Sequence, residues 1–131
     1  MGQQQLLLII LGVIIVGIAI AVGITMFSAA SVQANKDAIV NDLNNLAADA
    51  FQYRIRPATM GGGGGNYGGY KVRTKLASND NGTYTPTTAV AAGAQSFTLT
   101  GLSTSYAGSS VAAVIDSTGK LNSFTYNGQF Q

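Results

Sequence analysis

The chain has 131 residues, of which 47% are hydrophobic and only 9% charged, and its Lys and Arg residues exceed its Asp residues by a net charge of +2. It contains no Cys, His, Trp or Glu, which excludes thiol chemistry, Cys/His zinc sites and Ser-His or Cys-His nucleophilic pairs. We therefore expect a protein that is not an enzyme and that holds no cofactor.

The first predicted element is an uncharged apolar helix over residues 6–27. At about 1.5 Å per residue this helix reaches about 33 Å, enough to cross the hydrocarbon core of a bilayer. It is hydrophobic all round, unlike the amphipathic helix of a soluble domain. Gly17 with Ala21, and Ala19 with Gly23, form two overlapping small-xxx-small pairs, a spacing that lets helix backbones approach closely. The segment is thus a candidate transmembrane helix that associates with copies of itself.

Two alternatives stay open for this segment. One is a cleavable secretory signal, because Ser28-Ala29-Ala30 places small residues where a signal peptidase reads them. Against it, no Lys or Arg precedes the apolar run, and the run exceeds the usual ~7–15 residues of a signal. The other is a plain transmembrane anchor that holds a different functional domain at the membrane.

The helix is predicted to continue beyond the apolar segment through residues 31–56. This stretch contains no Gly or Pro, and its apolar residues recur at helical spacing along one stripe: Val32, Ile39, Leu43, Leu46, Ala50 and Tyr53. Polar residues fill the other faces, and Pro57 supplies the stop. The sequence therefore predicts one nearly continuous helix from about residue 3 to about residue 55, with residues 1–56 as the helical domain.

After the helix, residues 57–69 are predicted to be a flexible Gly-rich linker, since they include the run Gly61–Gly65. The pattern Gly63-x-Gly65-x-x-Gly68 formally fits a dinucleotide-binding fingerprint. It follows a helix instead of a strand, so it does not indicate cofactor binding.

Residues 70–131 are predicted to form a small β-rich head. Tyr70–Leu76 alternates apolar and polar residues, which predicts a strand, and the residues around Phe97 and Leu99 predict another. Residues 111–115 and 120–126, joined by the turn 116–119, predict a hairpin, while residues 79–82 and 103–105 are predicted loops. The expected fold is α+β, a small antiparallel sheet laid on the amphipathic part of the helix.

The head offers two further candidate sites. Lys71, Arg73 and Lys75 form a basic row that could contact anions, although a solvated strand face is the commoner explanation for such a row. Asn81-Gly82-Thr83 matches the glycosylation sequon at Asn81. The charge pattern indicates no dedicated nucleic-acid binding.

The helical part of the chain resembles the type IV pilin family, which includes the pseudopilins of type II secretion. The resemblance covers about residues 1–55: Gln5-Leu6-Leu7-Leu8-Ile9-Ile10 opens an uncharged run, Gly and Ala are spaced through Gly23, and the amphipathic continuation reaches Arg56. It implies a pilin-like lollipop whose apolar helix lies in the inner membrane before assembly. The helices then bundle as the core of a helical filament of identical subunits at the cell surface.

The resemblance also implies processing and an assembly interface. In the family, a prepilin peptidase removes a short leader and the new N-terminal residue is methylated, which would make Met1 the modified terminus. Pilus assembly machinery is the other implied partner. The residues expected at the assembly interface are Gln5, Leu6, Ile10, Val13, Gly17, Ala19, Ala21, Gly23 and Phe27.

The chain departs from the family pattern at two points. Gln5 stands where the family usually has Glu, so the family's salt bridge to a neighbouring N-terminal amine does not transfer. The helix-weakening Pro of many bacterial pilins is also missing. A filament subunit is the expected function, with a type II secretion pseudopilin or a membrane-anchored binding module as alternatives. The sequence does not choose among adhesion, motility, DNA uptake and conduction.

Overall fold

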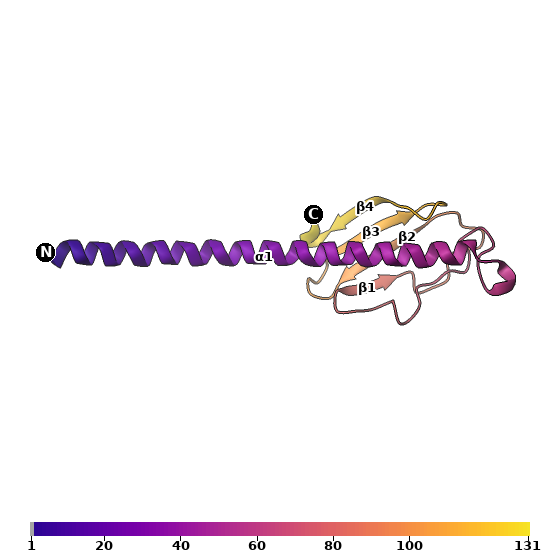
Figure 1. Cartoon of the computed structure of the whole chain (residues 1–131), viewed down its shortest axis with the longest axis horizontal. Helices are drawn as coiled ribbons and strands as arrows, with labels where there is room; N and C mark the ends of the chain where they lie inside the picture. Colours follow the sequence, from indigo (N-terminus) through magenta and orange to yellow (C-terminus); the bar gives the residue numbers. More distant parts are fainter. Residues whose placement is uncertain (1) are drawn as a thin grey trace. The chain divides into compact units, whose positions relative to one another are not determined.

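The computed structural model describes residues 2–131, and its elements are one long helix, two short 3₁₀ helices and four strands (Figure 1). Met1, the predicted site of N-terminal modification, lies outside the described residues. In chain order the elements are α1 (Gly2–Ile55), η1 (Ala58–Met60), β1 (Gly82–Thr85), β2 (Phe97–Ser103), β3 (Ser110–Ile115), β4 (Leu121–Asn127) and η2 (Gly128–Phe130). The predicted α+β fold is confirmed, and so is the extent of the long helix.

The chain divides into two compact units within α1, one ending at Val32 and the other running from Gln33 to Gln131. The first unit holds the apolar part of the helix. The second holds the amphipathic part of the helix together with the whole sheet. The second half of α1 supplies part of the core of this unit. From here on, the head is the whole unit of residues 33–131 and not only the predicted β-rich residues 70–131.

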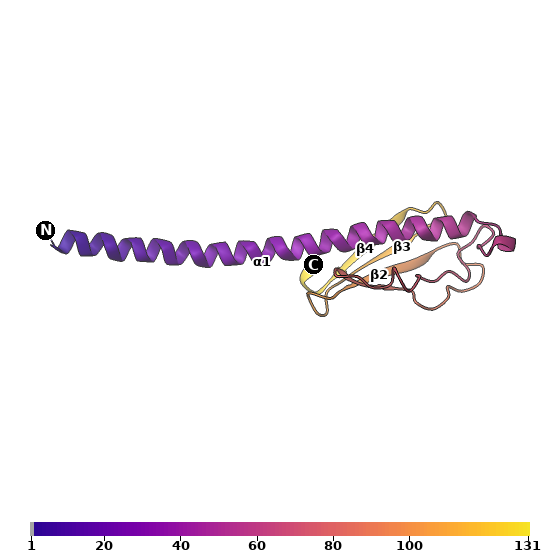
Figure 2. The ribbon, with the colours of Figure 1, turned by 60° about the horizontal axis from the view of Figure 1, so that its bottom comes forward.

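The core of the second unit lies between α1 and one face of the sheet (Figure 2). Four of the six residues of the predicted stripe are buried, namely Ile39, Leu43, Leu46 and Ala50, and Ala47 is buried beside them. The two end residues of the stripe, Val32 and Tyr53, are half-buried. Strand β3 buries every second residue, as expected for a strand with one face on a core. The sheet, the loops and η2 contribute the other large buried side chains, among them Tyr67, Tyr84, Leu99, Val111, Ile115 and Phe130.

A glycine in β2 sets how closely the helix approaches the sheet. A Cβ at Gly101 would lie 2.6 Å from Cγ2 of Ile39 and 2.9 Å from Cε1 of Tyr84, closer than van der Waals contact allows. Only a residue without a side chain fits there. The close packing of α1 on β2 therefore depends on Gly101.

The four strands form one antiparallel sheet in the order β1-β2-β3-β4. The predicted hairpin is confirmed as β3 and β4, with Ile115 paired to Leu121 and Val111 paired to Tyr126. Its turn is fixed by Asp116, whose carboxylate accepts hydrogen bonds from the backbone N–H groups of Thr118 and Lys120. Asp in a turn is expected to make such local backbone bonds.

The predicted strand over Tyr70–Leu76 was wrong. Tyr70 and Val72 are buried as their alternation suggested, but Leu76 is 44% exposed. The backbone here bonds to a neighbouring loop and not to a strand, with the N–H of Val72 donating to Pro86 and that of Val90 donating to Tyr70. The alternation thus reflects two side chains anchored in the core, without a sheet ladder.

The predicted Gly-rich linker is folded back onto the end of α1. The backbone N–H groups of Gly63, Gly65 and Gly64 donate to the carbonyls of Tyr53, Arg54 and Arg56, respectively. These bonds satisfy carbonyl groups that a helix end otherwise leaves without partners. A Cβ at Gly62 would lie 2.2 Å from the carbonyl oxygen of Arg56, so a larger residue does not fit. This stretch is therefore a hydrogen-bonded cap on the helix and not a free connector.

Candidate functional site

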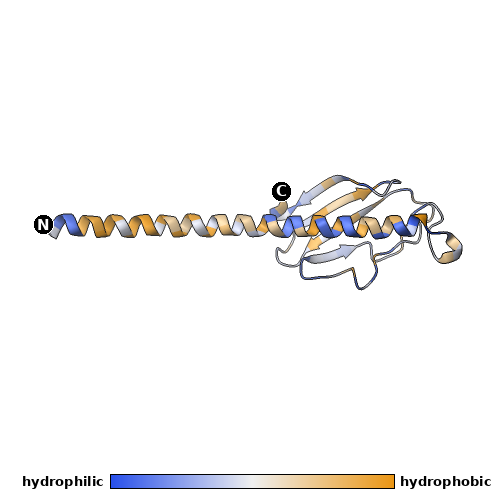
Figure 3. Cartoon of the chain, viewed as in Figure 1, coloured by the Kyte–Doolittle hydropathy of each residue, from blue (hydrophilic) through white to orange (hydrophobic). Residues whose placement is uncertain are grey.

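The apolar part of α1 is the first candidate site. Its large hydrophobic side chains are 48–76% exposed over residues 6–27, and its hydrophobic character extends along the whole segment (Figure 3). Within residues 2–131, one helix, α1, is long and apolar enough to cross a membrane, and no residue of its most apolar window is buried. All of the residues expected at an assembly interface, from Gln5 to Phe27, lie exposed on this segment.

The glycines of this segment have no packing role within the part of the chain that the structure describes. A Cβ built at Gly12, Gly17 or Gly23 would meet nothing within 4 Å. Gly in a helix interior costs about 1 kcal/mol of helix stability relative to Ala. The three glycines therefore weaken the helix, and no packing contact within residues 2–131 offsets that cost. Close approach of another helix is the usual physical reason for small residues in an apolar helix.

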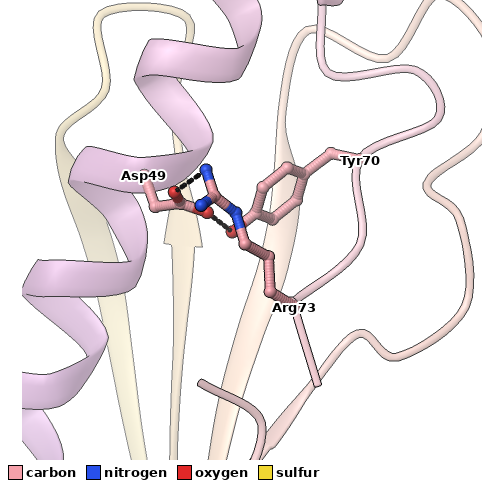
Figure 4. A network of polar contacts seen from close by, with 3 residues as sticks. All are labelled: Asp49, Tyr70 and Arg73. Atoms are coloured by element: carbon pink, nitrogen blue, oxygen red, sulfur yellow. Dashed lines mark hydrogen bonds and ion pairs between the residues drawn. The ribbon is translucent and has the colours of Figure 1, made fainter. Parts of the chain in front are cut away.

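The second candidate site is a groove in the head. It has a volume of about 880 Å³ and lies where the end of α1 meets residues 69–74, Ala77 and Thr87. At its centre, Nη2 of Arg73 lies 2.9 Å from Oδ1 of Asp49, and the Tyr70 hydroxyl donates to Oδ2 of Asp49 at 3.0 Å (Figure 4). Burial, together with the nearby Asp49 carboxylate, raises the pKa of Tyr70, so this hydroxyl stays protonated.

The structure divides the predicted basic row between two hollows. Lys71 and Arg73 line the groove together with Arg56, the first residue after α1. Lys75 lines a separate, smaller hollow beside Asp42 and Tyr84. The basic side chains gathered at the groove are thus Arg56, Lys71 and Arg73, and the contribution of Arg56 was missed because it lies far from Lys71 in the sequence.

A third cluster surrounds Asp42 on α1. Its carboxylate accepts hydrogen bonds from the Tyr84 hydroxyl, from Nδ2 of Asn79 at 2.9 Å and from Nδ2 of Asn81 at 3.1 Å. Asn81 carries the predicted glycosylation sequon and is half-buried. A sugar attached to Nδ2 of Asn81, the residue before β1, would modify the nitrogen that donates the hydrogen bond to Asp42 on α1. The cluster therefore links α1 to Tyr84 and to the loop before β1.

Comparison with known protein families, curated proteins and solved structures finds no match for this chain.

Two carboxylates of the head have pKa values below the ordinary value. Burial of Asp42 raises its pKa, but the hydrogen bonds from Tyr84, Asn79 and Asn81 together lower it further, so the net shift is downward. For Asp116, hydrogen bonds from the Thr118 hydroxyl and from the Lys120 backbone lower the pKa to about 2. Both groups are therefore held in the ionised form by native contacts.

These pKa shifts predict a head that loses stability in acid. A carboxylate with a lowered pKa in the folded state stabilises that state above the pKa of the unfolded chain, and this stabilisation disappears as the pH falls through the folded value. The melting temperature of the head should therefore change little between about pH 7 and 5 and should fall between about pH 4 and 2. Thermal unfolding followed by circular dichroism across this range checks the prediction. Asp116→Asn should flatten the most acidic part of the curve, and a melting temperature that rises on acidification would contradict it.

Proposed function

We propose that this protein is the structural subunit of a type IV pilus-like helical filament and polymerises through residues 6–27 of α1. The observation that carries the proposal is the exposure of this whole uncharged apolar segment. Water disfavours such a surface by about 25 cal/mol per Å² of apolar area, so it must be covered by lipid or by protein. In the proposed cycle, the inner membrane covers it before assembly and other subunits cover it in the filament.

Small residues support protein as the final cover. Moving the segment from lipid into a helix bundle exchanges one apolar environment for another, so close packing must select the partner. Among residues 2–131, a Cβ at Gly17 or Gly23 would meet nothing within 4 Å, so both positions offer a surface on which a neighbouring helix can pack. Processing by a prepilin peptidase and export by pilus assembly machinery belong to the same proposal.

Within this proposal the head is the part that faces the surroundings at the cell surface, and its role is structural and non-catalytic. A type II secretion pseudopilin shares the same architecture, a long apolar helix followed by a small head, and is the alternative within the same proposal. A membrane-anchored binding module is a second candidate, and the groove beside Asp49 is the specific observation that favours it.

A truncation tests which part of the chain drives assembly. The full chain should either require detergent or form filaments, whereas a fragment of residues 31–131 should stay soluble and monomeric, because it lacks the apolar segment and retains the head unit. Analytical ultracentrifugation of both, with and without detergent, measures the difference. A full chain that stays monodisperse and monomeric in plain buffer would sink the proposal.

A further inference from the structure

The groove beside Asp49 combines features of a ligand site that the filament role does not use. Its volume of about 880 Å³ falls within the range of about 300–1,000 Å³ that is typical of small-molecule sites. It is bounded by the C-terminal end of α1 on one side and by the anchored segment that carries Tyr70 and Val72 on the other. Both walls belong to the same compact unit of the chain.

The charge of the groove is positive. Three cationic side chains, Arg56, Lys71 and Arg73, line it against the single carboxylate of Asp49, which leaves a net charge of +2. Among residues 2–131, Arg73 is the only one of these cations with an ion-pair partner. A ligand with negative charge is therefore favoured, and it would find two cations that no carboxylate of the described chain neutralises.

Arg73 is held in position while most of its side chain stays accessible. One nitrogen bonds Asp49, which the Tyr70 hydroxyl fixes in turn, and the Arg73 side chain remains 63% exposed (Figure 4). Tyr70 is almost fully buried, so this anchor is part of the core. A pre-positioned guanidinium loses less entropy when it binds an oxyanion, and its planar fork matches a carboxylate or a sulfate.

The rest of the lining suits a sugar. Thr74 and Thr87 are exposed and supply hydroxyl groups that donate and accept hydrogen bonds. Tyr53 is half-buried and contributes an aromatic ring, whose position is fixed by packing 5.5 Å from the Tyr70 ring and by a hydrogen bond from its hydroxyl to the Gly68 carbonyl. Three cations are too few for the phosphate contacts of a dedicated nucleic-acid surface.

We propose that this groove binds an acidic saccharide, a sugar chain that carries carboxylate or sulfate groups. Arg73 and Arg56 bind the acidic groups, Lys71 adds positive charge at the rim, and Thr74, Thr87 and the Tyr53 ring contact the sugar itself. The site lies wholly in the head and functions whether or not the apolar segment assembles, so its test is independent of the filament test.

Binding of polygalacturonate, a polymer of uronic acid, to the full chain in a non-ionic detergent tests the proposal. Biolayer interferometry should detect binding that weakens with added salt, because charges contribute, and no binding of neutral dextran. Arg73→Gln and Arg56→Gln should each weaken the affinity about tenfold or more, since each removes charge-assisted hydrogen bonds. Lys75→Gln is the matched control: it removes the same charge from the separate hollow and should change the affinity less than about twofold.

Asp49→Asn separates a positioned arginine from simple charge attraction. This change makes the groove more positive, so simple attraction predicts tighter binding. Loss of the anchor on Arg73 predicts weaker binding instead, and we expect the affinity for polygalacturonate to fall several-fold. Circular dichroism confirms that each variant is folded. Should Arg73→Gln fail to fold, Arg56→Gln still decides, because the Arg56 side chain has no ion-pair partner among the described residues.

Three results would overturn the proposal. The first is an equal loss of affinity in Lys75→Gln and Arg73→Gln, which would indicate general attraction to a basic surface. The second is tighter binding by folded Asp49→Asn. The third is binding of single-stranded polythymidylate at least as strong as that of polygalacturonate, which would point to a nucleic-acid surface.

Discussion

Replacing Gly17 with Leu should abolish or visibly shorten the filaments while leaving the amount of protein in the membrane fraction unchanged. Within the described part of the chain, a Cβ at residue 17 meets nothing within 4 Å, so the subunit itself tolerates a larger side chain. Leu also favours membrane insertion. In a packed helix bundle the added volume typically costs about 1–3 kcal/mol per site, and a helical filament repeats that cost in every subunit. Electron microscopy of filament yield and length measures the effect.

Ala21→Leu should behave like Gly17→Leu, because residue 21 is the second member of the same small-xxx-small pair. Ile14→Leu is the control, since its side chain is already exposed and the substitution keeps nearly the same volume. Normal filaments from all three variants would mean that the segment is only a membrane anchor, and the function would then have to be sought in the head.

Leu43→Ala should lower the free energy of unfolding of the head by about 2–5 kcal/mol, the usual range for a fully buried Leu in a well-packed core. Leu43 is 0% exposed and lies on the stripe of α1 that packs against the sheet. Since the whole free energy of unfolding of a small domain is about 5–15 kcal/mol, this loss should be visible at once in chemical denaturation.

Ile55→Ala is the matched control for this prediction, because it removes a large aliphatic side chain that is 60% exposed on the same helix. Its effect should stay within about 0.5 kcal/mol, as is usual for surface positions. If Leu43→Ala unfolds at the same denaturant concentration as Ile55→Ala, the second half of α1 does not belong to the core of the head.

The long helix and its buried stripe were predictable because helical periodicity leaves a direct trace in the sequence. The spacing of Ile39, Leu43, Leu46 and Ala50 predicted the face that the structure buries. The β3 and β4 hairpin was predictable for a similar reason, since the turn that begins at Asp116 separates two runs of strand-forming residues.

The prediction of a strand over Tyr70–Leu76 was wrong because alternation indicates which side chains are buried and not which groups the backbone bonds to. Tyr70 and Val72 reach the core from an irregular loop. Strand β1 was not predicted because it has only four residues. The turn residues Asn79, Asp80 and Asn81 before it also favoured a loop. Pairing with β2 is a tertiary contact that these short-range signals do not carry.

The groove was only partly predictable. Lys71 and Arg73 stood out as part of a basic row, but Lys75 belongs to a different hollow and Arg56 joins from the end of α1. The folded-back glycine cap brings these segments together, and composition alone predicted a flexible linker in its place. A site assembled from segments far apart in the chain has no characteristic residue spacing in the sequence, so it could not be predicted from a local pattern.

Whether this chain polymerises into a surface filament is decided by electron microscopy of material sheared from cells that express it, with mass spectrometry of the filament protein and its N-terminus. We expect thin filaments in which this chain is the main component, and their loss in the Gly17→Leu variant. Recovery of the native chain only from the membrane fraction, with no filaments in the sheared material, would show that it does not assemble into a filament.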